Sequence, residues 1–157
     1  LLYYGDEIGT LNDCSYQSDA DKAHDNRWVH RPVINWQRAE KRNHTGTVEF
    51  AIFSALKKMI SVRKEVEVFA DLNNRELIDV GNPHLFVCKR YSLHRMGEQV
   101  LVVANFDSKP QKLELAQIQK GPVQCGIMHD LYTGQKPDCF NGSLVIPGLS
   151  FYWLMEG

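Results

Sequence analysis

Residues 1–13, LLYYGDEIGTLND, open the chain with an apolar run that ends at a glycine followed by two acidic residues. No polar residue interrupts Leu1–Tyr4, a pattern typical of a strand in a parallel sheet that is covered on both faces. A native protein rarely begins inside such a strand, and neither an initiating methionine nor a basic leader precedes it. We therefore expect the chain to be a piece of a longer protein.

A polar stretch rich in Asp, Asn and Ser runs from Gly5 to about His44. An unstructured loop of this length is unusual in a compact domain and is usually functional. Helical spacing of apolar residues then predicts a helix from Thr47 to Val66, with Thr47 as its N-cap. Its apolar stripe is broad, so we expect the helix to lie between a barrel and a second domain.

After Phe69 the hydrophobic period changes to two. Turn residues separate short candidate strands at Glu76–Val80, His84–Ser92, Gln99–Phe106, Lys112–Ala116, Gln124–Leu131, Leu144–Ile146 and Phe151–Met155. Such strands, with no helical pattern between them, predict an antiparallel β-sandwich. A buried strand, a long loop, a helix and an all-β tail fit the last βα unit of a TIM barrel with an appended β domain. The expected fold class is α+β, with domains at 1–68 and 69–157.

Composition excludes several classes of protein. Hydrophobic residues make up 43% and charged residues 24%, so neither disorder nor a coiled coil is indicated. A net charge of −1 gives no reason to expect nucleic acid or a membrane surface as a partner. Oligomeric state stays open, and a cytoplasmic location is favoured. The cysteines show no CxxC spacing, which favours free buried thiols over a disulfide at Cys14, Cys88, Cys125 and Cys139.

Two motifs resemble a known enzyme family. The run Gly5–Asp13 resembles the end of the eighth barrel strand in the α-amylase superfamily, where many members carry Tyr-x-Gly-Asp/Glu-Glu-Ile/Val-Gly. Its Gly-Thr-Leu-Asn-Asp continuation and the later Asp25-x-Arg27-Trp28-x-His30-Arg31-Pro32 closely resemble amylosucrases and their sucrose-hydrolysing relatives. Residues 57–63 resemble the superfamily's last barrel helix, and residues 130–134 and 144–154 resemble its C-terminal β domain. The resemblance thus spans the whole chain.

The resemblance implies a retaining enzyme that takes sucrose, releases fructose and passes glucose to an α-glucan or to water. Such enzymes need a nucleophile and a general acid/base, two carboxylates about 5 Å apart. The family places both, with a further Asp and His, on barrel strands upstream of Leu1. We therefore assign no catalytic residue and no cofactor to this chain, and expect it to be inactive alone. Sucrose and α-glucan would be its partners through the missing barrel.

Arg27 is the residue that the resemblance singles out. In amylosucrases the matching arginine pairs with an aspartate from elsewhere in the barrel and closes the floor of the glucosyl pocket. A guanidinium suits this task, because its planar fork grips a carboxylate with two hydrogen bonds and stays charged. The substrate-binding candidates are therefore Arg27 and Asp25, which either supports Arg27 locally or is solvated.

Other polar residues are weaker candidates. Asp6 and Glu7 follow the expected barrel strand, but adjacent strand residues point to opposite faces, so they do not form a facing pair. We expect them to anchor the following loop through backbone N–H groups. His24 and His30 lie near aspartates, but nothing supplies a tetrahedral set of ligands, so no metal site is expected.

Alternative functions stay open. Another superfamily member, such as an α-glucosidase, a sucrose phosphorylase or a sucrose hydrolase, would differ in its upstream residues. A carbohydrate-binding module would use the β domain, where aromatic side chains could form a stacking platform at Tyr91, Tyr132, Phe151, Tyr152 and Trp153. Alternation along a strand would bury about half of these rings, and packing in the core is favoured.

Overall fold

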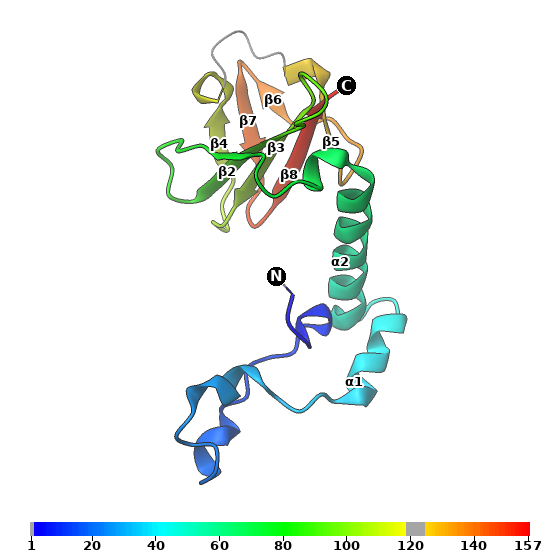
Figure 1. Ribbon diagram of the computed structural model, residues 1–157, viewed down its shortest axis with the longest axis vertical. Coiled ribbons are helices and arrows are strands. Elements are labelled where there is room, and N and C mark those ends of the chain that lie inside the picture. The colour runs from blue at the N-terminus through cyan, green and yellow to red at the C-terminus, as the bar shows by residue number, and fades with distance from the viewer. Residues whose placement is uncertain (1, 119–124) are drawn as a thin grey trace. The chain divides into compact units, whose positions relative to one another are not determined.

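The computed structural model of the protein describes residues 2–118 and 125–157. The chain divides into two compact units, Leu1–Ile60 and Ser61–Gly157. Short 3-10 turns and two helices come first, and antiparallel β-strands follow (Figure 1). This order confirms the α+β class expected from the change in hydrophobic period.

The expected first strand does not form. Residues 2–4 have no strand partner among the described residues, and the side chains of Leu2, Tyr3 and Tyr4 are 55%, 47% and 40% exposed. Backbone N–H and C=O groups in a strand need neighbours to pair with, and an apolar sequence alone does not supply them. The chain instead turns at Gly5 (φ 90°) into a 3-10 turn at Asp6–Ile8. Leu1 lies outside the described residues.

The polar stretch after Gly9 is not structureless, contrary to expectation. It holds three further 3-10 turns, Cys14–Ser18, Asn26–His30 and Lys41–Asn43, and a short helix, α1 (Trp36–Glu40). The first two of these turns and α1 each begin with an Asp or Asn side chain that accepts a backbone N–H: Ser15 to Asp13 (2.8 Å), Arg27 to Asp25 (3.0 Å) and Arg38 to Asn35 (2.9 Å). Short polar side chains therefore organise the loop through local hydrogen bonds.

The main helix, α2 (Val48–Glu65), lies within the predicted range. The backbone N–H of Phe50 donates to the Thr47 hydroxyl at 3.2 Å, so the predicted N-cap is confirmed. The turn that ends at Gly9 lies close against α2, because a Cβ on Gly9 would meet the Ile52 side chain at 2.5 Å. Two buried side chains, Ile8 and Ala39, contribute the apolar interior of this unit.

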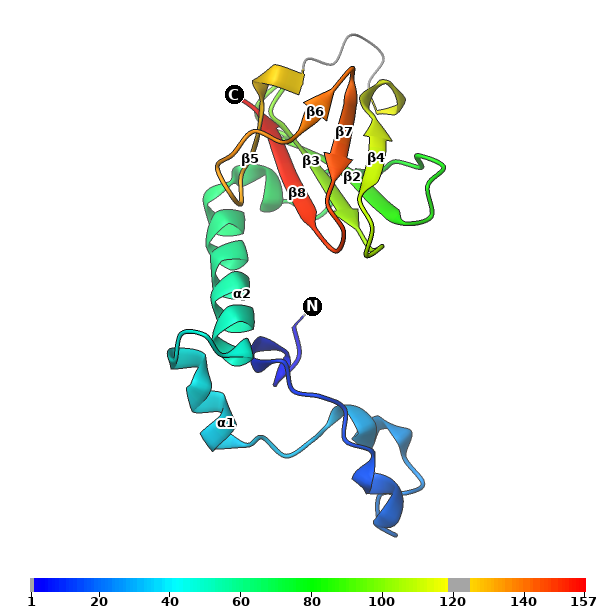
Figure 2. The same ribbon diagram turned by 180° about the vertical axis from the view of Figure 1, so that it is seen from behind.

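The second unit contains two antiparallel sheets (Figures 1 and 2). The larger has the strand order β1 (Arg75–Leu77), β2 (Leu85–Tyr91), β3 (Gln99–Asn105), β8 (Phe151–Glu156) and β5 (Met128–Asp130). The smaller has the order β4 (Gln111–Glu114), β7 (Ser143–Ile146) and β6 (Cys139–Phe140). Each predicted strand after Phe69 overlaps an observed one. The pattern missed β6, and Gln124 lies outside the described residues.

One core joins the two sheets. Val87, Val103 and Leu154 come from the larger sheet. Leu113, Leu144 and Ile146 come from the smaller, and all six are at most 1% exposed. In β3, β4 and β7 these positions alternate with more exposed ones, as expected where the inner faces of two sheets pack together. The opposite face of the larger sheet carries a smaller cluster of Val68, Phe69 and Val100.

The cysteines differ from the expectation of free buried thiols. Cys88 is free and buried, as expected, but Cys14 is free and exposed. Cys139 is disulfide-bonded. Sequence spacing reports CxxC motifs but not which distant thiols the fold brings together, and so could not show this bond. The side chain of Cys125 lies outside the described residues.

Candidate functional site

Asp25 and Arg27 form a paired fork at the start of the turn Asn26–His30. The Arg27 Nε donates to Asp25 Oδ1 at 2.8 Å, and its Nη2 donates to Oδ2 at 2.8 Å. The Arg27 backbone N–H also donates to Oδ1, at 3.0 Å. The pair is therefore built from a residue and its own N-cap, two positions apart. The Arg27 side chain is 71% exposed and that of Asp25 is 19% exposed.

The pair is charged at neutral pH. Hydrogen bonds from the Arg27 side chain and backbone lower the pKa of Asp25 to about 2. The Asp25 carboxylate in turn raises the pKa of Arg27. Opposite charges held in contact favour the ionised form of both groups. Arg27 is thus a fixed cation at the surface of this loop.

Hydrogen bonds between two arms brace the loop that carries Arg27. The Asp13 N–H donates to the Val29 carbonyl at 2.9 Å, and the Tyr4 hydroxyl donates to the Pro32 carbonyl at 3.2 Å. His30 Nδ1 lies 3.1 Å from Asn12 Oδ1. These contacts hold residues 4–13 beside residues 29–32 and leave residues 14–28 as the tip of the loop.

Two cations in the same loop lie near the Trp28 ring. Lys22 Nζ lies 5.4 Å and Arg31 Cζ lies 5.9 Å from its centroid, within the range of cation–π attraction. An open hollow of about 500 Å³ adjoins this region, lined by Ala23, His24, Asp25, Asn26 and Arg27. The two predicted candidates, Asp25 and Arg27, therefore lie together, and both line this open hollow.

Asp6 and Glu7 do accept backbone N–H groups, but not from the loop that follows them. Asp6 Oδ2 accepts from Tyr3 N at 2.8 Å, and Glu7 Oε2 accepts from Gly5 N at 2.9 Å. The expected direction was wrong because the chain reverses at Gly5, which brings the preceding amides to the two carboxylates. These residues shape the entry to the loop.

The histidines have different surroundings. His30 contacts Asn12, and His24 lines the hollow beside Arg27. Within residues 2–118 and 125–157, no group of three or more His, Cys, Asp or Glu side chains could hold a metal ion. Nor does any helix in this part of the chain have the length and apolar character needed to cross a membrane.

The aromatic side chains of the β unit pack on one another at steep angles. Tyr132 contacts Phe151 at 5.1 Å between centroids, Phe151 contacts Trp153 at 5.7 Å, and their planes are tilted by 52°. Tyr152 packs against the core between the sheets, whereas Tyr91 is 37% exposed. Tilted rings are typical of packed aromatics, not of a flat surface on which sugar rings stack.

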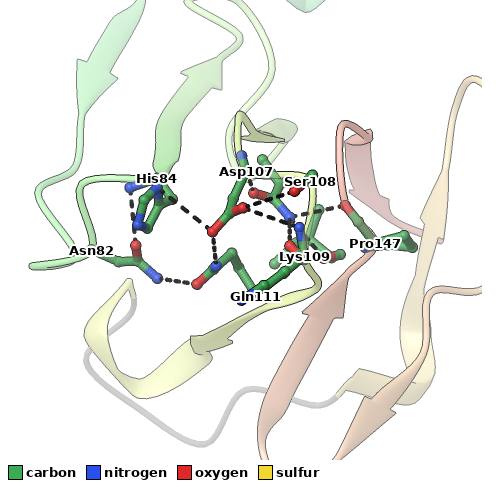
Figure 3. Close-up of polar contacts among 9 residues, drawn as sticks. Asn82, His84, Asp107, Ser108, Lys109, Gln111 and Pro147 are labelled. Carbon is green, nitrogen blue, oxygen red and sulfur yellow. Dashed lines mark hydrogen bonds and ion pairs between the residues drawn. The ribbon is translucent and has the colours of Figure 1, made fainter.

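A polar cluster that the sequence analysis missed lies at one end of the sandwich (Figure 3). Asp107 accepts from the Gln111 side chain at 2.9 Å, and Gln111 in turn accepts from Asn82 at 2.9 Å. His84 Nδ1 lies 3.8 Å from Asp107 Oδ2. The Lys109 backbone N–H is the main cause of the lowered pKa of Asp107.

Next to this cluster, the buried amide of Asn105 donates to the carbonyls of Ile146, at 3.2 Å, and Pro147, at 3.0 Å. Asn105 ends β3 in the larger sheet, and Ile146 ends β7 in the smaller one. These bonds satisfy backbone groups and tie the two sheets together. The cluster is thus structural. Its only sequence signal is the turn-forming Asn105-Phe106-Asp107-Ser108.

No family model matches the chain. Solved structures that share its fold include the α-glucosyl transfer enzyme XgtA, with 18% identity, a TM-score of 0.55, and coverage of 83% of this chain and 22% of that one. AmyP, solved with maltose, has 14% identity, a TM-score of 0.54, and coverage of 71% and 22%. Eubacterium rectale Amy13B has 16% identity, a TM-score of 0.53, and coverage of 75% and 21%.

These three proteins differ from the chain at most positions of the sequence. The chain spans only about a fifth of the length of each. At such identities the likeness is one of fold. The chain therefore shares its fold with a segment, about a fifth of the length, of each of these three proteins.

Proposed function

We propose that the chain is the C-terminal part of a longer, amylosucrase-like enzyme that transfers glucose from sucrose with retention of configuration. Residues 1–68 would form the end of its catalytic barrel, with α2 as the last barrel helix, and residues 69–157 its C-terminal β domain. The fold that the chain shares with a segment of the α-glucosyl transfer enzyme XgtA and of AmyP, solved with maltose, supports this proposal. The amylosucrase-like motif around Arg27 supports the choice of sucrose as donor.

The observation that carries the proposal is the fork between Arg27 and Asp25 at the tip of a braced loop. An arginine has five N–H donors, and the fork occupies only the Nε and one Nη2 hydrogen. Arg27 is mostly exposed, so the remaining donors are accessible. In the longer enzyme they would bind a second carboxylate, from the barrel, and together close the floor of a pocket for one glucosyl unit.

The bond-breaking chemistry would belong to the barrel. A retaining transfer needs a carboxylate nucleophile that attacks the anomeric carbon and an acid/base that protonates the departing fructose. A second acceptor, an α-glucan hydroxyl or water, then takes the glucosyl group. The chain would contribute positioning of the sugar, through an ionised guanidinium that stays in place during both steps.

The test is activity of the longer protein that contains this chain. Purified enzyme with sucrose should release fructose, and with glycogen or a maltooligosaccharide added it should lengthen the glucan. Three outcomes would overturn the proposal: turnover of maltose without turnover of sucrose, a strict requirement for inorganic phosphate, or no turnover. The first would indicate an α-glucosidase and the second a sucrose phosphorylase.

A further inference from the structure

Arg38 connects three segments of the first unit. It lies in α1, its Nε donates to Glu49 Oε1 in α2 at 2.6 Å, and its Nη2 donates to the Gly9 carbonyl at 3.0 Å. Gly9 is where the chain enters the Arg27 loop, and α1 is where it leaves. One guanidinium therefore closes the base of the loop and attaches it to the long helix.

We call the contact of Arg38 with both Glu49 and Gly9 the clamp. Both of its acceptors are held in place. Glu49 is only 7% exposed, and the hydrogen bond from Arg38 is the main cause of its lowered pKa. Gly9 adopts φ 63° against Ile52 of α2, where a side chain would clash. The backbone N–H of Arg38 is itself fixed by the side chain of Asn35 at 2.9 Å. Both acceptors of the Arg38 guanidinium are thus held by the surrounding structure.

The clamp acts on Arg27 through the two arms of the loop. The arms are joined at Arg38–Gly9, Tyr4–Pro32, Asn12–His30 and Asp13–Val29. The last three contacts hold the two arms together, but none of them attaches the loop to α2. Within the described residues, the Arg38 side chain is what joins both arms to that helix by hydrogen bonds.

We propose that Arg38 is a positioning residue, which sets the direction in which the Arg27–Asp25 fork faces by clamping both ends of its loop to Glu49. This inference rests on the proposed function for its effect on catalysis, but not for its effect on the loop. It assigns to Arg38 and Glu49 a role that requires both the charge and the shape of the guanidinium. Lysine could pair with Glu49 but could not also reach Gly9 with a fixed fork.

The first experiment measures the position of the loop in this chain. Cys14 is a free, exposed thiol at the tip, and Lys57→Cys would place a second one on the exposed side of α2. Spin labels at the two sites should give a narrow distance distribution by double electron–electron resonance. Arg38→Met and Glu49→Gln should each broaden it about twofold or more, and Arg38→Lys should broaden it less.

The matched control is Glu40→Gln, which removes the charge of Glu40 from its neighbouring pair with Arg42 (3.8 Å) without touching Gly9 or Glu49. It should leave the distance distribution unchanged. Circular dichroism of each variant would show that α2 is intact, and the milder Arg38→Lys serves if Arg38→Met unfolds. A distribution in Arg38→Met and Arg38→Lys that matches the unsubstituted chain would overturn the proposal.

The second experiment asks whether the clamp acts through Arg27 in the longer enzyme. Arg38→Met should lower kcat/KM for sucrose about 10-fold, and should have little further effect in an Arg27→Ala background. Additive losses would show that Arg38 acts independently of Arg27 and would refute positioning. If the enzyme does not turn over sucrose at all, the proposed function fails, whereas the distance measurement still decides the clamp.

Discussion

The carboxylate of Asp130 accepts a hydrogen bond from the backbone N–H of Trp153, 2.8 Å away, although the two residues are 23 positions apart in the sequence. The same side chain accepts from the N–H and the hydroxyl of Thr133, at 2.9 Å and 2.7 Å. Asp130 is only 1% exposed. One buried carboxylate thus fixes the turn after β5 and joins that turn to β8.

Asp130→Ala should destabilise the β unit by about 3 kcal/mol, because three donors lose their acceptor in a buried site. Asp130→Asn should destabilise the unit less, because its amide oxygen can still accept from Trp153. Some loss should remain, because the NH₂ group would face the donors of Thr133. Urea unfolding of the chain, followed by far-ultraviolet circular dichroism, measures both. A loss below about 1 kcal/mol for the alanine variant would show that water replaces the carboxylate.

Gly148→Ala should also destabilise the β unit, by about 2–4 kcal/mol, through overpacking. A Cβ at Gly148 would lie 2.0 Å from the Ser108 carbonyl oxygen, which belongs to the backbone and cannot rotate away. Gly126→Ala is the matched control, because a Cβ there meets no atom of the described residues within 4 Å. Thermal melts of the two variants should differ by several degrees. Equal melting temperatures would contradict the close approach at Gly148.

The Asp25 carboxyl should titrate at about 2 in the folded chain, because the Arg27 side chain and backbone hydrogen-bond to its ionised form. A carboxyl whose pKa is lowered on folding stabilises the folded state at pH values above its ordinary pKa, about 3.9 for aspartate. That contribution should be lost as the pH falls through about 2. Carbon-13 NMR of the side-chain carboxyl would give the midpoint.

The control for this titration is Arg27→Ala, which should raise the Asp25 midpoint toward about 3.9. The Arg27 backbone N–H remains in that variant, so part of the lowering should persist. A midpoint that is the same with and without the guanidinium would show that the fork is not formed in solution.

In the longer enzyme, Arg27→Ala should lower kcat/KM for sucrose roughly 100-fold or more, with little loss of stability. Removing the guanidinium would take from the pocket floor the donor that positions the glucosyl ring, so the loss should fall on catalysis and not on folding. Arg27→Lys should rescue poorly, because an ammonium is a point charge without a fork. Near-normal kinetics in the alanine variant would mean that Arg27 is an ordinary surface charge.

This chain alone should release no fructose from sucrose above the buffer blank, because it carries no residue assigned as nucleophile or acid/base. The assay needs preparations that are free of host glycosidases, and an unrelated protein purified in the same way provides the blank. Reproducible turnover that scales with the amount of chain would contradict the assignment of catalysis to residues outside it.

Periodicity accounts for most of the fold that could be predicted. The helical repeat and the N-cap at Thr47 located α2, and alternation located the strands of the sandwich. Periodicity failed at residues 2–4, because their apolar sequence fits a strand but the described part of the chain offers them no strand to pair with. It also failed at β6 (Cys139–Phe140), since two residues are too short to show a period.

The candidate site was predictable only where its contacts are local. Asp25 and Arg27 are two positions apart, so their spacing allowed a pair, although it could not decide between pairing and solvation. Arg38 and Glu49 are 11 positions apart, and their contact depends on how α1 folds back on α2. The sequence carries no signal for such a contact, because many arginines and glutamates lie at similar separations.

The position of β8 has a consequence for how the protein is made. β8 (Phe151–Glu156) lies between β3 and β5, although it follows both in the sequence. While residues 151–156 are still inside the ribosome, the larger sheet exists as two separate pieces, and β3 presents an unpaired edge. An open strand edge readily pairs with other chains. Completion of this sheet therefore waits until β8 has left the ribosome, and until then the nascent chain needs protection from aggregation.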